Sequence, residues 1–192
     1  LEAEAGGYVG RGRFGGVVAL PGGRCAKLLR RERSPADRSV AHAVFGEVSA
    51  LSRLRGTGAA AELLDFGAAA DRYVIVMERC ALGTLFDWRE PVRDDVGVLW
   101  RAFAQTARCI ATAHAKGVVH LDLKSENVLL RGDPREMADA VCLGDFGEAR
   151  LLGPAQTDAR ALRAHGTECV AAPEVVAGAK GSAGAAVGPP AD

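Results

Sequence analysis

The most informative stretch of this sequence is His120-Leu121-Asp122-Leu123-Lys124-Ser125-Glu126-Asn127. It gathers an aspartate, a lysine and an asparagine, and apolar runs flank it at Val118-Val119 and Val128-Leu129-Leu130. A loop that only faces solvent does not need apolar flanks, so the pattern predicts a polar loop held between two short strands. Polar side chains fixed in this way are typical of a functional loop on a rigid scaffold.

A second polar group follows this loop. Asp145-Phe146-Gly147 comes 18 residues after Asn127, shortly behind another apolar run, Val141-Cys142-Leu143. Both runs are predicted strands, so Asn127 and Asp145 are expected at adjacent strand ends. Amide and carboxylate oxygens suit a hard cation such as Mg²⁺. The sequence therefore predicts a magnesium site formed by these two residues.

A glycine-rich segment, Gly10-Arg-Gly12-Arg-Phe-Gly15-Gly-Val17, lies near the start of the chain. Glycines let a hairpin backbone approach phosphates closely, with its N–H groups directed at them. The pattern alone is equally compatible with a plain turn. It lies between two predicted strands rather than between a strand and a helix, which disfavours a Rossmann site. The sequence has no GxxxxGK[ST] motif, so a Walker-type phosphate loop is not expected.

Lys27 interrupts an otherwise apolar predicted strand. A lone lysine in a strand is more often an edge or surface residue. If Lys27 points inward, it needs a counter-charge, and Glu47 in the following predicted helix, residues 37–55, can supply it. That helix is predicted by apolar residues that recur at intervals of three and four, with Asp37 as a possible cap.

The remaining pattern divides the chain into a strand-rich block and a helical block. A linker is expected at 78–87, and the clearest helix at 94–116 has one apolar stripe and a following glycine. The run Tyr73–Met77 is unbroken and apolar, which predicts a strand buried on both faces. Together with the strand at 72–77 that contains this run, strands are expected at 8–9, 16–20, 24–29 and 62–66.

The composition narrows the classes of function. The chain has 24 basic and 24 acidic side chains and a formal net charge of zero, so we expect no nucleic-acid partner. No apolar run approaches the roughly 18 residues of a membrane-spanning helix, so no membrane segment is expected. Nothing in the sequence indicates an oligomeric state. Widely spaced cysteines predict reduced thiols in a cytoplasmic, or alternatively nuclear, protein: Cys25, Cys80, Cys109, Cys142 and Cys169.

Taken in order, these motifs resemble the signature set of eukaryotic-type protein kinases. The stretch Gly166-Thr167-Glu-Cys-Val-Ala-Ala172-Pro173-Glu174 resembles the end of that family's activation segment, and lysine at position 124 resembles the serine/threonine branch. The resemblance implies an α+β, bilobal fold. Its parts are an antiparallel five-stranded N-lobe with one helix and an incomplete, mainly helical C-lobe. The implied kinase-like domain covers 5–178, with an N-lobe of about 5–80, a partial C-lobe of about 81–178, and a low-complexity tail at 179–192.

The resemblance also implies a site for ATP. The loop glycines would cover the phosphates, and Lys27 would hold the α- and β-phosphates while pairing with Glu47. Met77 falls at the gatekeeper position, and the backbone of Glu78 and Cys80 would meet adenine. Asp87, or less favourably Thr84, would meet the ribose. The residues implied for nucleotide binding are Gly10, Gly12, Gly15, Val17, Cys25, Lys27, Met77, Glu78, Cys80, Asp87 and Leu129.

The implied reaction transfers the ATP γ-phosphate to serine or threonine hydroxyls of protein substrates, with Mg²⁺. Asp122 would accept the substrate hydroxyl proton and Lys124 would steady the γ-phosphate, with Thr167 bracing both. Asn127 and Asp145 would bind the metal. The apolar spine that the family stacks between its lobes would fall at Leu51, Leu64, His120 and Phe146.

Two departures from the family pattern bear on function. Leu121 replaces the arginine that grips a phosphorylated activation loop, so we expect activity that does not depend on phosphorylation of that loop. The family continues through further helices after the Ala172-Pro173-Glu174 motif, whereas this sequence continues with Gly178 to Asp192, rich in alanine, glycine and proline. The alternative to an active kinase is therefore a catalytically weak or inactive kinase-like module that binds nucleotide or protein.

Overall fold

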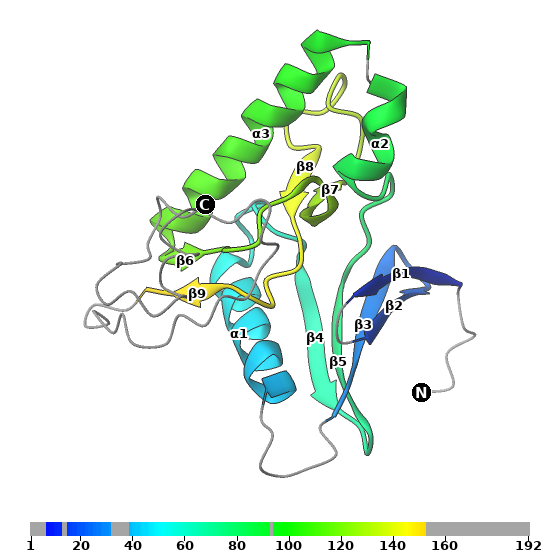
Figure 1. Cartoon of the computed structure of the whole chain (residues 1–192), viewed down its shortest axis with the longest axis vertical. Coiled ribbons are helices and arrows are strands. Elements are labelled where there is room, and N and C mark those ends of the chain that lie inside the picture. The colour runs from blue at the N-terminus through cyan, green and yellow to red at the C-terminus, as the bar shows by residue number, and fades with distance from the viewer. Residues whose placement is uncertain (1–6, 13–14, 32–38, 93, 153–192) are drawn as a thin grey trace, which may run out of the picture.

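The computed structural model describes residues 7–12, 15–31, 39–92 and 94–152. The sheet and helix α1, Ser39–Leu54, form one half of the molecule in Figure 1, and helices α2, Leu85–Val92, and α3, Val96–Ala115, lie in the other. Thr167 and the 166–174 motif lie outside the described residues, as do Asp37 and the 179–192 segment. The predicted domain boundaries therefore stay predictions.

The first half is an antiparallel sheet in the order β1-β2-β3-β5-β4. The turn Pro21-Gly22-Gly23 joins β2 to β3, and positive φ angles of 75° and 67° at its glycines explain why glycine is used there. Helix α1, Ser39–Leu54, packs against β4 and β9 and buries Leu51 and Leu54. The strands are β1 Tyr8–Gly12, β2 Gly15–Leu20, β3 Arg24–Arg30, β4 Leu63–Ala68 and β5 Arg72–Glu78.

Two predictions about burial in this sheet are wrong. Strand β5 is not buried on both faces: Ile75 and Met77 are buried, whereas Tyr73, Val74 and Val76 are partly exposed. In β4, Leu63 is buried and Leu64 is 42% exposed, so Leu64 does not belong to an apolar spine. Successive side chains of a strand point to opposite faces, and only one face of this sheet packs into the core.

The second half is built around α3, Val96–Ala115, close to the predicted 94–116. The Asp95 side chain caps it by accepting a hydrogen bond of 3.1 Å from the Val98 amide. Gly117 follows with φ of 67°, as a helix-ending glycine does. The structure also forms α2, Leu85–Val92, which overlaps the end of the predicted linker. Only eight residues long, α2 has too little apolar periodicity to be recognised in sequence.

Two short antiparallel pairs connect these halves. Strand β7, Val128–Leu130, pairs with β8, Val141–Leu143, and β6, Val118–Val119, pairs with β9, Arg150–Leu151. The strands β7 and β8 lie between the sheet and α3 in Figure 1 and are almost fully buried. The Leu143 amide donates to Ala59 O, and the Ala61 amide donates to Leu143 O, both at 2.9 Å. These bonds join β8 to the segment that precedes β4.

The architecture confirms the predicted fold class: a five-stranded antiparallel sheet with one helix, followed by a mainly helical part. Within the described ranges, no helix is both long and apolar enough to cross a membrane.

Candidate active site

Lys27 lies between two carboxylates from different parts of the chain. Its Nζ is 2.8 Å from both Oε1 and Oε2 of Glu47 on α1, and 2.6 Å from Oδ1 of Asp145 after β8. Lys27 points inward because it lies directly opposite Ile75 of β5 and so shares a face of the sheet with that fully buried side chain. Of the two orientations that the sequence left open, the structure shows the inward one, with Glu47 as the partner of Lys27.

The three charges shift one another's proton affinity. Burial alone would lower the pKa of Lys27, but the carboxylates of Glu47 and Asp145 outweigh it and raise the pKa above its usual 10.5. Burial also works to raise the pKa of Asp145, but the Lys27 ammonium lowers it below its usual 3.8. Lys27 is therefore held as a cation and Asp145 as an anion at neutral pH.

A second polar cluster forms in the loop between β6 and β7. Lys124 Nζ lies 2.8 Å from Asp122 Oδ2, and the Asn127 side-chain nitrogen donates to Asp122 O at 2.8 Å and Oδ2 at 3.0 Å. A 3-10 turn, η1 (Ser125–Asn127), reverses the chain so that Asn127 faces back towards Asp122. Asp122 and Asn127 are both buried, so their orientation is fixed by packing as well as by hydrogen bonds.

His120, at the start of this loop, contacts the segment that follows β8. Its Nε2 lies 2.9 Å from Gly144 O, and its ring packs on Phe146 with centroids 4.6 Å apart. Both side chains are fully buried, as the predicted spine requires of these two positions. Leu121 and Asp145 have φ angles of 65° and 56°, an uncommon left-handed conformation for residues other than glycine. Strain of this kind often occurs at functional sites.

The pairing of β7 with β8 brings the two predicted metal ligands to the same end of a hairpin. The Gly144 amide donates to Asn127 O at 2.8 Å, so Asn127 and Asp145 are adjacent across the strand ends. The Asn127 amide nitrogen is directed at Asp122, which leaves its Oδ1 as the oxygen for a cation. The Asp145 side chain is 47% exposed. This donor set is composed of hard oxygens and fits Mg²⁺.

The glycine-rich segment forms the hairpin β1–β2, with Gly12 opposite Gly15. A Cβ atom at Gly15 would lie 1.6 Å from Leu28 O, so glycine is needed there for the close approach of β3. A Cβ at Gly10 would meet nothing within 4 Å. The structure therefore explains Gly15 by strand packing and leaves the space next to Gly10 open.

The apolar side chains predicted to line the adenine slot lie close together in the structure. Cys25 and Met77 are buried and stand directly opposite each other in β3 and β5. Val17 and Leu129 are partly buried and pack against the same apolar cluster. Leu129 also forms a bridge with Thr84, so the segment after β5 lies alongside β7.

The side chain of Glu78 has a structural partner that the sequence did not predict. Its Oε1 accepts hydrogen bonds from Nε of Arg131, at 2.8 Å, and from the Glu62 amide, at 3.1 Å. Arg131 also donates to Gly58 O and Ala60 O, each at 2.8 Å. It thus ties the linker to the segment before β4. The only signal in the sequence is an arginine directly after a buried strand.

The two candidate ribose residues interact with each other. Asp87 Oδ2 accepts a hydrogen bond of 2.7 Å from Thr84 Oγ1, and the Asp87 amide donates to Thr84 Oγ1 at 3.1 Å. This reciprocal arrangement caps the start of α2, as a capping box does. Asp87 therefore has a structural role in the first turn of α2, where its side chain is exposed.

Comparison with known proteins agrees with this geometry. A family model described as "Protein kinase domain" matches residues 4–188. The chain is 33% identical over 181 residues to CBL-interacting protein kinase 4 of Oryza sativa subsp. japonica, which is 90% of this chain and 38% of that protein. It is 34% identical over 137 residues to serine/threonine-protein kinase ULK1 of Homo sapiens, which is 68% of this chain and 12% of that protein.

The chain spans less than half the length of these relatives. The match to the family model nevertheless covers almost all of it, including every described element. The chain belongs to the eukaryotic-type protein kinase family, in its serine/threonine branch.

Proposed function

We propose that this protein transfers the γ-phosphate of ATP to serine or threonine hydroxyls of protein substrates, in a reaction that requires Mg²⁺. The observation that carries the proposal is that Lys27 of β3, Asp122 and Asn127 of the loop between β6 and β7, and Asp145 after β8 come together from three separate segments. Phosphoryl transfer needs charge neutralised and an oxygen nucleophile aligned, and little covalent chemistry from the protein.

Lys27 acts on the nucleotide side of the reaction. Its ammonium group, held by Glu47, binds the α- and β-phosphates and fixes their position. Lys27 is already charged before nucleotide binds, because Glu47 and Asp145 raise its pKa. Asn127 and Asp145 would hold Mg²⁺, which would neutralise part of the phosphate charge.

Asp122 acts on the acceptor side. Its carboxylate accepts the proton of the substrate hydroxyl, while the Asn127 amide fixes its orientation through bonds to O and Oδ2. Lys124 holds the γ-phosphate next to the acceptor, a role supported by its distance of 2.8 Å from Asp122 Oδ2. A carboxylate that is oriented before substrate arrives requires less reorganisation during the transfer.

Adenine occupies the slot next to Cys25, Met77 and Leu129. The backbone of Glu78 and Cys80 supplies its hydrogen bonds, and the β1–β2 hairpin covers the phosphates. The Arg131 contact with Glu78 keeps this linker in one position. Thr167, outside the described residues, is proposed to brace Asp122 and Lys124.

The alternative is a module that binds nucleotide without transferring phosphate. A kinase assay with radiolabelled ATP, a generic basic protein substrate and Mg²⁺ distinguishes the two. The proposal expects incorporation into serine and threonine by the wild-type chain, and incorporation lower by about 10²-fold or more in Asp122→Asn and Asp145→Asn. Equal background in all three, with retained ATP binding by the wild type, would support the binding module instead.

A further inference from the structure

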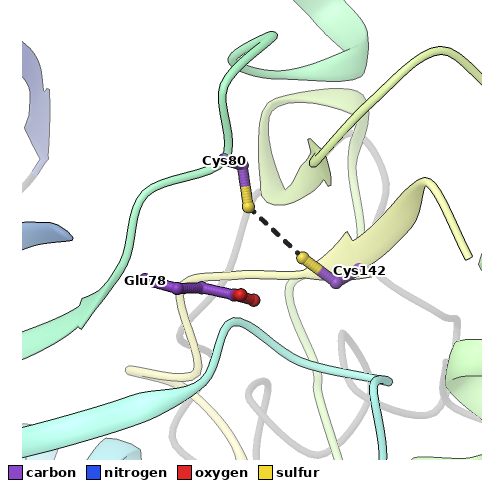
Figure 2. A group of neighbouring side chains, drawn as sticks. All are labelled: Glu78, Cys80 and Cys142. Atoms are coloured by element: carbon purple, nitrogen blue, oxygen red, sulfur yellow. Dashed lines mark hydrogen bonds between the residues drawn. The ribbon is translucent and has the colours of Figure 1, made fainter. Parts of the chain in front are cut away.

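Two cysteines that are far apart in sequence meet where the linker passes β8. Cys80 Sγ lies 3.5 Å from Cys142 Sγ, across a separation of 62 residues. Figure 2 shows the two side chains pointing at each other, one from the linker after β5 and one from β8, with Glu78 beside them. Cys80 is partly exposed, whereas Cys142 is fully buried. Cys80 is thus the residue of the pair that solvent reaches in part.

The surroundings favour Cys80 over Cys142 as the thiol that loses its proton first. The hydrogen bond with Cys142 lowers the pKa of Cys80, and the nearby Arg131 guanidinium lowers it further, against the opposing effects of burial and Glu78. The same hydrogen bond and burial raise the pKa of Cys142. A partly exposed thiolate beside a cation is the usual setting of an oxidation-sensitive cysteine.

A metal ion is a less suitable occupant of this cluster. Glu78, Cys80 and Cys142 do place three possible ligand atoms close together. However, the Glu78 carboxylate already binds the Arg131 guanidinium, which also lies close enough to affect both thiols. A divalent cation would have to enter next to that fixed positive charge.

We propose that Cys80 and Cys142 are a modification site, at which a hydroperoxide converts the thiol pair into a reversible disulfide. The Cys80 thiolate attacks one peroxide oxygen, the O–O bond breaks, and with hydrogen peroxide the leaving hydroxide takes a proton to become water. The product is a sulfenic acid at Cys80. The Cys142 thiol then attacks this sulfur and a second water leaves. Two thiols are oxidised, one peroxide is reduced to two waters, and a small thiol can reverse the change.

The disulfide joins two segments that carry the proposed nucleotide site. The sulfurs must approach from 3.5 Å to a bond of about 2.05 Å, so the linker or β8 has to move. The backbone of Cys80 is proposed to form hydrogen bonds with adenine, and Cys142 lies three residues before Asp145. The oxidised chain therefore binds nucleotide at least about threefold more weakly than the reduced chain, a consequence that rests on the proposed function.

Two other buried cysteines lack this combination. Cys25 lies near the linker, but its Sγ faces Glu78 O at 3.5 Å, and burial raises its pKa to about 11. Cys109 on α3 is buried, and its thiol donates to Val141 O at 3.4 Å. Both are held as neutral thiols, so oxidation is expected to select the pair Cys80–Cys142.

The experiment uses the full 192-residue chain, first reduced and then treated with hydrogen peroxide. Remaining thiols are alkylated, and the sample is mapped by mass spectrometry of peptides without reduction. The expected result is one major cross-linked peptide pair, containing Cys80 and Cys142, which a thiol reductant separates. Cys142→Ser should lose the cross-link and let a sulfenic-acid reagent label Cys80. Cys109→Ser and Cys169→Ser are matched controls that should keep the cross-link.

Several outcomes would overturn the proposal. The first is a cross-link that involves Cys25 or Cys169 in place of the Cys80–Cys142 pair. The second is the absence of any cross-link in a chain that circular dichroism shows to be folded. The third is a cross-link that persists in Cys142→Ser. Cys142→Ala tests the same point if the serine variant does not fold. In a separate measurement, a fluorescent ATP analogue is bound before and after peroxide. Cross-linking with unchanged affinity would overturn the coupling to nucleotide, and no binding by the reduced chain would overturn the proposed function alone.

Discussion

The Asp145 carboxylate accepts a hydrogen bond of 2.6 Å from the ammonium group of Lys27, a residue 118 positions earlier in the chain. The two residues belong to opposite halves of the molecule, β3 of the sheet and the end of β8. Their contact joins the sheet to the segment that follows β8. Because Glu47 binds the same ammonium group, the position of α1 is coupled to that of Asp145.

Replacing Lys27 by methionine should weaken both binding and folding. The change leaves buried Glu47 without its cation, and breaking a buried pair in this way costs about 3–5 kcal/mol of unfolding free energy. Phosphate transfer should fall by about 10²–10³-fold. Urea unfolding and a radiolabel assay at low temperature measure the two effects. Lys116→Met, an exposed site at the end of α3, is the control and should change neither.

The variant Asp122→Asn should separate catalysis from binding. It keeps the shape of the side chain but cannot accept the substrate proton, so the transfer rate should fall by about 10²–10⁴-fold while ATP-analogue affinity stays within about twofold. Steady-state kinetics and fluorescence titration provide the two numbers. Asp65→Asn, an exposed carboxylate in β4, should behave like the wild type. An Asp122→Asn variant with near-normal turnover would remove Asp122 from the role of base.

The Lys27–Asp145 pair predicts how stability depends on acid. The pKa of Asp145 is lower in the folded chain than its usual 3.8, so its contribution is fully present above that value. The contribution is lost as pH falls through the lower, folded-state pKa. The stability difference between wild type and Asp145→Asn should therefore be larger at about pH 6 than at about pH 3. Urea midpoints at both values test this, and a difference that grows in acid would contradict it.

Arg131 should matter for stability through the geometry of its guanidinium group. Arg131→Ala removes the bonds to Glu78, Gly58 O and Ala60 O, and should lower the unfolding free energy by about 2–3 kcal/mol. Arg131→Lys keeps the charge but cannot make the same planar set of bonds, so it should restore only part of the loss. Thermal unfolding of the three proteins measures the order. Full rescue by lysine would show that charge alone is sufficient.

Leu121 predicts activity without phosphorylation of the activation loop. The side chain at this position is apolar and buried, so it offers no guanidinium to a phosphate group. Treatment of the purified protein with a phosphatase, followed by removal of the phosphatase, should leave the transfer rate within about twofold of a mock-treated sample. A loss of most of the activity, reversed by rephosphorylation, would contradict the prediction.

The sequence alone determined the order of most elements and the identity of the polar cluster. Alternation and helical periodicity are local properties, so the sheet strands, α1 and α3 were predictable within a few residues. The spacing from Asp122 to Asn127 to Asp145 was readable because these residues lie at the ends of short apolar strands. Helix α2 was missed because its capping pair, Thr84 and Asp87, resembles an ordinary polar linker.

Only the tertiary structure decided which residues meet. The inward direction of Lys27, the burial of Leu63 rather than Leu64, the bonds of Arg131 and the Cys80–Cys142 pair all depend on how distant segments pack. A residue's own neighbours in sequence set its backbone preference, but the face it presents and its partner across space are set by strand register and by the packing of the two halves. For this reason the sequence was sufficient to identify the polar residues of the site, whereas the contacts between distant residues required the tertiary structure.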